Sequence, residues 1–227
     1  MKNITIGLLS LVLLISLTAC SYGKESPSSH RDSEMEPGDP LASENSETNH
    51  MQSVSGELSK ALVVYFSCTG NTEEAALSIA DQTGADVYEI VPEQPYTEAD
   101  LDYQNDACRA NQEMRDPSAR PAMTGGVDGL ENYEVLYLGY PIWWGTMPKI
   151  LHTFLDRYDL SGKTVLPFCT SGGSGMTTSV TELQEAEPEA DIREGLRISS
   201  SSDESRSAEI VQWLEENGLS HKRREFE

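Results

Sequence analysis

The chain has 227 residues and a formal net charge of −22 at pH 7, because 38 Asp and Glu outnumber 16 Lys and Arg. This balance argues against proteins that bind nucleic acids through phosphate contacts, and an anionic membrane surface would repel it. It favours either plain solubility or docking to a basic partner. The length suffices for a leader, a polar segment and one domain of roughly 170 residues, whose core requires neither disulfides nor a metal.

Residues 1–19 have the features of a targeting sequence. Lys2 precedes an apolar run over residues 4–17, which is too short to span a bilayer comfortably. The run ends in Leu-Thr-Ala-Cys at residues 17–20, which resembles the lipobox of bacterial lipoproteins. The resemblance implies a signal peptide cleaved before Cys20, a diacylglycerol on its thiol, and an extracytoplasmic protein lipid-anchored to the bacterial cell membrane. A secretory signal without lipidation is the alternative.

Residues 20–57 are rich in Ser, Glu, Asp, Pro and Asn and nearly free of aliphatic side chains. Such a segment cannot bury enough apolar surface to offset its ordering entropy, so we predict a disordered tether. The folded domain is predicted to occupy residues 58–227.

From residue 60 onward, apolar runs alternate with segments of helical periodicity. The runs predict strands at 61–66, 86–91, 133–140, 164–169 and 191–198. Apolar spacing and capping signals predict helices at about 72–83, 97–114, 147–158, 177–186 and 203–217, with a loop over 116–132. This β-α alternation predicts a parallel sheet with helices on both faces, linked by right-handed crossovers.

Some of these elements have distinctive residues at their ends or interiors. Asn71 or Thr72 is placed to cap the first helix, and residues 97–100 have the spacing of a capping box that opens the second. Pro167 conflicts with the fourth strand because it lacks an N–H, so we expect it at the strand end or at a bulge. The last helix is predicted to be buried through Ala208, Val211 and Leu214.

In sheets of this kind ligands bind outside the carboxyl ends of the strands, so the loops after the first, third and fourth strands form the candidate site. The first loop crowds hydroxyls, an amide and a glycine together: Ser67, Cys68, Thr69, Gly70, Asn71 and Thr72. The helix that follows offers unpaired N–H groups and a positive dipole end, so this loop can hold a phosphate without Lys or Arg. No Lys follows the glycine, which excludes the nucleotide-triphosphate P-loop. A hydroxyl-rich turn that only caps a helix is the alternative.

The second loop contains two adjacent tryptophans: Pro141, Ile142, Trp143, Trp144 and Gly145. The indoles offer flat apolar surface on which an aromatic ring can stack, and one of them is expected to fill the core beneath the next helix. The third loop contains Thr170, Ser171, Gly172, Gly173 and Gly175. Its glycines allow backbone N–H groups to approach a ligand closely. A Gly-Ser run alone is typical of a flexible linker, so its place at the same sheet edge is the informative feature.

The three loops together resemble the flavodoxin superfamily across most of residues 60–217. The first loop matches the pattern Thr/Ser-x-Thr-Gly-x-Thr at every fixed position, and the second and third are similar to flavodoxin-like and quinone-reductase-like proteins. The resemblance implies a five-stranded sheet of order 2-1-3-4-5 and noncovalent FMN, with its phosphate in the first loop and its ring against Trp144. The third loop holds no aromatic residue, which implies an open ring face.

Neither a disulfide, a metal site nor a catalytic residue is predicted. With the third strand between the first and fourth, Cys68 and Cys169 would lie roughly 9–10 Å apart, beyond the reach of a disulfide. Cys108 is interpreted as a third small buried residue. His152 has no second ligand at metal spacing.

The predicted function is therefore redox chemistry through FMN. The main hypothesis is an electron carrier at the extracytoplasmic membrane face. Its redox partner is a protein or a small-molecule electron donor or acceptor, which the sequence does not identify. An FMN-dependent NAD(P)H or quinone oxidoreductase is the first alternative, since an open ring face would admit a substrate. A cofactor-free binding lipoprotein on the same scaffold is the second, and the intact hydroxyls of the first loop argue against it.

Overall fold

The structure, a computed structural model, describes residues 60–199 and 202–219. The predicted leader, the predicted tether and Cys20 lie outside the described residues. Strands occupy Ala61–Tyr65 (β1), Asp86–Glu89 (β2), Val91–Pro92 (β3), Met123–Thr124 (β4), Val135–Pro141 (β5), Thr164–Thr170 (β6), Asp191–Ile192 (β7) and Leu196–Ile198 (β8). Helices occupy Asn71–Thr83 (α1), Arg109–Arg115 (α2), Lys149–Arg157 (α3), Thr177–Ala186 (α4) and Asp203–Glu216 (α5), with 3-10 turns at Ala99–Leu101 (η1) and Leu130–Asn132 (η2). Within these ranges, no helix is long and apolar enough to cross a membrane.

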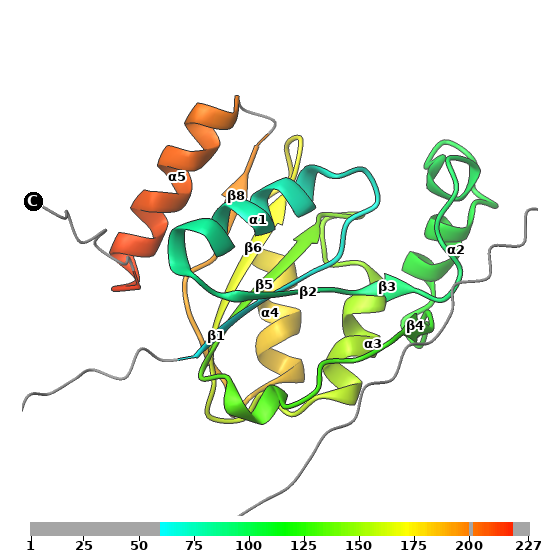
Figure 1. Cartoon of the computed structure of the whole chain (residues 1–227). Coiled ribbons are helices and arrows are strands. Elements are labelled where there is room, and N and C mark those ends of the chain that lie inside the picture. Colours follow the sequence, from blue (N-terminus) through cyan, green and yellow to red (C-terminus); the bar gives the residue numbers. More distant parts are fainter. Residues whose placement is uncertain (1–59, 200–201, 220–227) are drawn as a thin grey trace, which may run out of the picture. The chain divides into compact units, whose positions relative to one another are not determined.

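The predicted parallel sheet is confirmed, including its strand order. The main sheet runs β2-β1-β5-β6-β7, with β8 as a second partner of β6, and every pairing in it is parallel. In the numbering of the predicted strands this order is 2-1-3-4-5. The short strands β3 and β4 form a separate antiparallel pair. Figure 1 shows α1 and α5 over one face of the sheet and α3 and α4 over the other.

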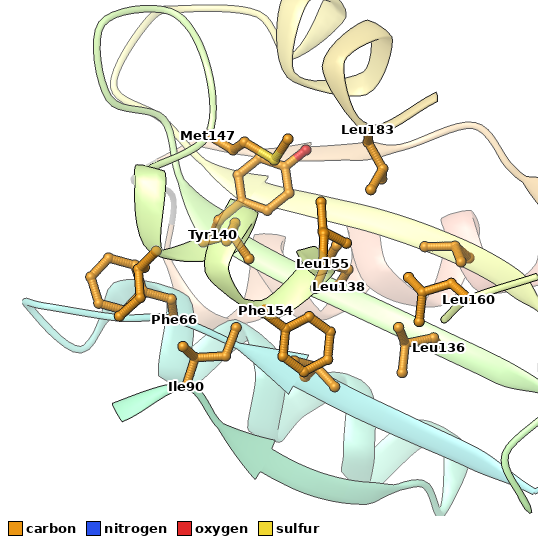
Figure 2. Packing of buried hydrophobic residues seen from close by; sticks show 14 of the residues in the cluster. Phe66, Ile90, Leu136, Leu138, Tyr140, Met147, Phe154, Leu155, Leu160 and Leu183 are labelled. Carbon is orange, nitrogen blue, oxygen red and sulfur yellow. The ribbon is translucent and has the colours of Figure 1, made fainter. Parts of the chain in front are cut away.

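Alternating side chains of the central strands divide the core into two layers. In β1, Val63 and Tyr65 belong to the layer beneath α1 and α5, whereas Leu62 and Val64 belong to the opposite layer. Figure 2 shows that opposite layer, in which Leu138 of β5 packs in one cluster with residues of α3 and α4. Each fully buried aliphatic or aromatic side chain contributes about 1.5–3 kcal/mol. This two-sided burial fixes the carboxyl ends of β1, β5 and β6 side by side.

Pro167 lies in the middle of β6 and not at its end or at a bulge, so that prediction was wrong. It pairs with Leu138 of β5 in an unbroken register. The N–H of Thr164 bonds toward β5, whereas the carbonyl of Val165 accepts from Arg193 on the other side. Alternation therefore turns the nitrogen of Pro167 away from β5, toward the break between β7 and β8. No ladder hydrogen bond is lost, because no strand residue pairs there.

The predicted second helix is largely replaced by turns. Thr97 and Asp100 do form the reciprocal hydrogen bonds of a capping box, but the box opens only η1. The α-helix begins later, at Arg109, with the thiol of Cys108 accepting from the N–H of Asn111. The predicted strand at 86–91 is likewise divided, since its last residue pairs in β3.

The last helix is present but is buried on a different face. Ile210, Trp213 and Leu214 are buried, whereas Ala208 is exposed and Val211 only half-buried. The indole N–H of Trp213 donates to the carbonyl of Glu194 at 2.8 Å, which fixes this rotation of α5. The prediction identified Leu214 correctly and placed the centre of the buried stripe wrongly.

Candidate functional site

The first loop ends in an open helix N-terminus. Gly70 is the residue before α1, with φ of 86°, and its N–H donates to the hydroxyl of Ser67 at 3.1 Å. Neither Asn71 nor Thr72 caps the helix as predicted, since Gly70 takes that position and supplies no side chain. The first N–H groups of α1 have no acceptor inside the helix. They are therefore available, together with the positive end of the helix dipole, to an anion.

A hydrogen bond joins the first loop to the third. The hydroxyls of Thr72 and Thr170 lie 2.8 Å apart, and Thr72 is buried. The carbonyl of Thr170 accepts from the N–H of Ile142 at 3.0 Å, so the second loop is attached at the same point. The three predicted loops thus meet at the carboxyl edge of β1, β5 and β6.

The second loop contains a tight turn with a strained tryptophan. Trp143 and Thr146 exchange backbone hydrogen bonds of 2.9 and 3.0 Å, and the two residues between them have positive φ, 50° at Trp144 and 85° at Gly145. Turns of this form suit small or flexible residues, and a bulky residue at positive φ is an outlier that is typical of functional sites. Trp144 itself is 50% exposed.

The other tryptophan, Trp143, is part of the protein's own packing. Its ring meets those of Phe66 and Tyr96 edge-on, with centroids 5.7 and 5.3 Å away. One tryptophan was predicted to fill the core, and Trp143 does so at its edge. Trp144, the residue predicted to contact a ring, is left half exposed.

Two neighbouring pockets lie at this edge and share Thr69, Pro141 and Ile142. The aromatic pocket has a volume of about 390 Å³ and is also lined by Cys68, Thr72, Leu101, Tyr103, Ala110, Trp143 and Trp144. The polar pocket has a volume of about 190 Å³ and is also lined by Asn71, Thr170, Ser171, Gly172, Ile198, Ser199 and Arg206. One pocket thus offers flat apolar surface and the other offers hydroxyls, an amide and a guanidinium.

The remaining predicted residues shape the loops: Ser67, Gly70, Gly145, Gly173 and Gly175. In the third loop the N–H of Gly173 donates to the hydroxyl of Ser171 at 3.3 Å. A Cβ built on Gly172, Gly173 or Gly175 would meet nothing of the protein within 4 Å. The protein's own packing therefore does not demand glycine at these positions.

The outer wall of the aromatic pocket comes from residues 93–122, which sequence reasoning missed. Leu101, Tyr103 and Ala110 line it, and the side-chain amide of Asn111 holds the turn by donating to the carbonyls of Tyr103 and Asn105 at 3.1 and 2.8 Å. In Figure 1 this segment, in green, lies beyond β3 and β4. Nothing in the sequence marks Leu101 or Tyr103 as site residues, because they come from turns far along the chain.

A polar network fixes this wall to Trp143. The hydroxyl of Tyr96 donates to Glu113 at 2.5 Å, and Arg109 pairs with the same carboxylate at 2.6 Å while its guanidinium lies 4.1 Å from the Tyr96 ring centroid. Burial, followed by the hydrogen bond to Glu113, raises the pKa of Tyr96 well above its ordinary value. The phenol therefore stays protonated and acts as a donor.

Residues 60–217 match the family model for flavodoxin. The chain belongs to the flavodoxin family. It is similar to proteins assigned as flavoproteins from Bacteroides eggerthii, with 42% identity and a TM-score of 0.66 over 71% of this chain and 99% of that one, and from Bacteroides uniformis, with 39% identity and a TM-score of 0.64 over 69% and 98%. A flavoprotein of Lactobacillus acidophilus, solved in complex with FMN, shares the fold at 21% identity and a TM-score of 0.53 over 66% and 99%. Among curated proteins, none matches the chain significantly.

The titratable groups beside the site of this flavodoxin are not built as nucleophiles. Cys68, Cys108 and Cys169 are free thiols, and burial raises the pKa of Cys68 to about 12. A thiol of that pKa carries almost no thiolate at neutral pH. His152 of α3 lies 3.6 Å from Glu182 and its Nε2 has no hydrogen-bond partner. Burial, assisted by Lys149, lowers the pKa of His152, so it is neutral at pH 7 and the pair is not ionic there.

Proposed function

We propose that this flavodoxin binds one FMN noncovalently and transfers electrons through it. The observation that carries the proposal is the meeting of an uncapped helix N-terminus, at Gly70, with the outward-facing indole of Trp144 at one sheet edge. The N–H groups of α1 and the hydroxyls of Thr69 and Thr170 suit a phosphate, and Trp144 suits a planar ring. When bound, FMN supplies the electron-transfer chemistry, and this chain supplies its orientation and environment. The solved FMN complex of a protein with this fold supports the choice of cofactor.

The first test is an absorbance spectrum of the purified protein after incubation with FMN and desalting. We expect flavin bands that survive desalting, with FMN released on denaturation. A folded protein that retains no flavin would refute the redox function and favour a cofactor-free binding protein.

We further propose that the protein works as an electron carrier at the extracytoplasmic membrane face, anchored by lipid on Cys20. The support is the lipobox-like sequence at residues 17–20. The two acyl chains of a diacylglycerol anchor a protein stably to a membrane, whereas a single chain binds only marginally. The test is membrane fractionation of the full chain against Cys20→Ala, with labelled fatty acid. We expect label and membrane association in the parent chain and neither in the variant. Association that survives the substitution would contradict a lipid anchor.

A specific observation also favours the alternative of an FMN-dependent NAD(P)H or quinone oxidoreductase. Trp144 is 50% and Tyr103 71% exposed, and both line the aromatic pocket. Two exposed aromatic side chains in one pocket offer surface on which a second planar molecule can stack. Steady-state oxidation of NAD(P)H with a quinone acceptor separates the hypotheses, since a carrier shows no turnover beyond free FMN.

A further inference from the structure

A largely buried guanidinium lies beside the proposed phosphate site. Arg206 belongs to the first turn of α5, lines the polar pocket together with Thr69 and Asn71, and has a side chain only 15% exposed. Its Nη1 donates to Oε2 of Glu74 at 2.6 Å, and its Nη2 to Oδ1 of Asp203 at 3.2 Å. Of the described residues that line the two pockets, it is the only charged one.

The partners of Arg206 do not account for its burial. The Glu74 carboxylate is 60% and the Asp203 carboxylate 96% exposed, so both interactions are open to solvent screening. Ion pairs of that kind contribute little to stability, whereas withdrawing a guanidinium from water is unfavourable. The Arg206 guanidinium is therefore desolvated without full compensation, and it lies at a pocket whose other lining residues are neutral.

The position of Glu74 locates the guanidinium relative to α1. Glu74 is three residues beyond Asn71, hence about 4.5 Å further along the helix axis. The end of the Arg206 side chain therefore lies beside the first turn of the helix whose free N–H groups suit an anion. A guanidinium presents five donors in a planar fork, so it can keep Asp203 as a partner while the donors now held by Glu74 turn to a phosphate.

We propose that Arg206 is a phosphate ligand of the bound flavin and makes the site selective for phosphorylated flavin. This inference rests on the proposed function. Without flavin the guanidinium is held by Glu74, and the phosphate takes the place of that carboxylate as its partner. Arg206 and Glu74 therefore have opposite effects on FMN affinity. The arginine strengthens phosphate binding, and the glutamate weakens it by competing for the same donors.

The test is a titration of the full chain, purified in detergent, with FMN and with riboflavin, which lacks the phosphate. Quenching of flavin fluorescence gives both dissociation constants. In Arg206→Gln we expect FMN to bind about 10-fold more weakly or worse, and riboflavin to change by less than about twofold. Glu74→Gln should tighten FMN several-fold and leave riboflavin unchanged.

The matched control is Arg193→Gln. Arg193 also pairs with an aspartate, Asp191, at 2.7 Å, but it lies at the opposite edge of the sheet, beside the start of β6. This variant loses the same charge, so we expect it to change neither constant. Equal weakening of FMN and riboflavin by Arg206→Gln, with a lowered Tm, would show that Arg206 only braces α5 and would overturn the inference.

These titrations distinguish failure of the proposed function from failure of the inference about Arg206. Parent protein that binds neither flavin refutes the proposed function and this inference with it. Parent protein that binds FMN, with an unchanged FMN-to-riboflavin ratio in Arg206→Gln, refutes the inference alone. If Arg206→Gln does not fold, Glu74→Gln decides, because it retains the arginine and must still tighten FMN selectively.

Discussion

The polar and the aromatic pocket adjoin each other but are built differently. The polar pocket is lined mainly by loops that follow β1, β5 and β6 directly, together with residues 198–199 at the end of β8 and Arg206 of α5. The aromatic pocket shares the β1 and β5 loops but takes its outer wall from residues 93–122, which hold together through Tyr96, Arg109 and Glu113. The phosphate end of the proposed site therefore depends on the sheet, whereas the ring end depends on a separately stabilised wall.

The largest expected effect is on the ring side and concerns the two tryptophans. Trp143→Ala removes the ring that contacts Phe66 and Tyr96, so we expect the free energy of unfolding to fall by about 2 kcal/mol. This is less than the roughly 3–5 kcal/mol typical of a fully buried tryptophan, because Trp143 is only half-buried. Trp144→Ala should change stability by less than about 0.5 kcal/mol, because its ring is half exposed. Urea unfolding measures both. Equal losses in the two variants would contradict the division of roles.

The next effect separates the wall from the sheet. Glu113→Ala leaves Arg109 and the hydroxyl of Tyr96 without their shared partner, at an expected loss of about 1–2 kcal/mol. Since the wall lines only the aromatic pocket, FMN and riboflavin should both bind more weakly and by the same factor. Fluorescence titration of both flavins measures this. A selective loss of FMN would show that the wall also supports the phosphate end.

This difference between the pockets also explains what the sequence could predict. The strands and three loops were predictable because continuous apolar runs mark buried parallel strands, and the site loops follow them directly. The wall was not, because side chains compete with helix formation across the predicted helix at 97–114. Asp102 and Asn105 accept from N–H groups two residues later, at 3.2 and 3.0 Å, and so form turns.

Arg206 was missed for a related reason. The apolar residues Ala208 and Val211 suggested one face of α5, but the large side chains Ile210 and Trp213 determine the buried one. Arg206 precedes Ile210 by four residues and therefore lies on that buried face. Tertiary packing, absent from any local pattern, thus decides which arginine reaches the site.

A smaller effect is expected on the phosphate side. Thr72 lines the aromatic pocket, but its hydroxyl bonds that of Thr170 in the polar pocket, so Thr72→Val tests whether this link serves the phosphate end alone. We expect FMN to bind about 3- to 10-fold more weakly, the worth of one hydrogen bond, with riboflavin unchanged. Thr72→Ser keeps the hydroxyl and should bind FMN as the parent does. The same flavin titrations provide the measurement, and an equal loss for riboflavin would place Thr72 at the ring end instead.

The smallest effect concerns pH and again distinguishes the pockets. The described residues that line the polar pocket include no histidine and no carboxylate. The Trp144 turn, by contrast, is held by the hydroxyl of Thr146, which donates to Glu182 at 2.6 Å. The same carboxylate lies 3.6 Å from His152, whose side chain is 15% exposed. The aromatic side of the site therefore has a histidine among the residues that support it.

The sign of this pH effect follows from the pKa of His152. Burial lowers that pKa below its ordinary value of 6.5, so the unfolded chain binds the proton first as pH falls. The stability due to neutral His152 is complete above pH 6.5 and is lost as pH falls toward the folded-state pKa. In His152→Gln we expect the free energy of unfolding to vary less with pH below 6.5 than in the parent, because the other titrating groups are common to both. Urea unfolding across this window measures the difference, and an identical pH dependence would show that His152 is already solvated in the folded protein.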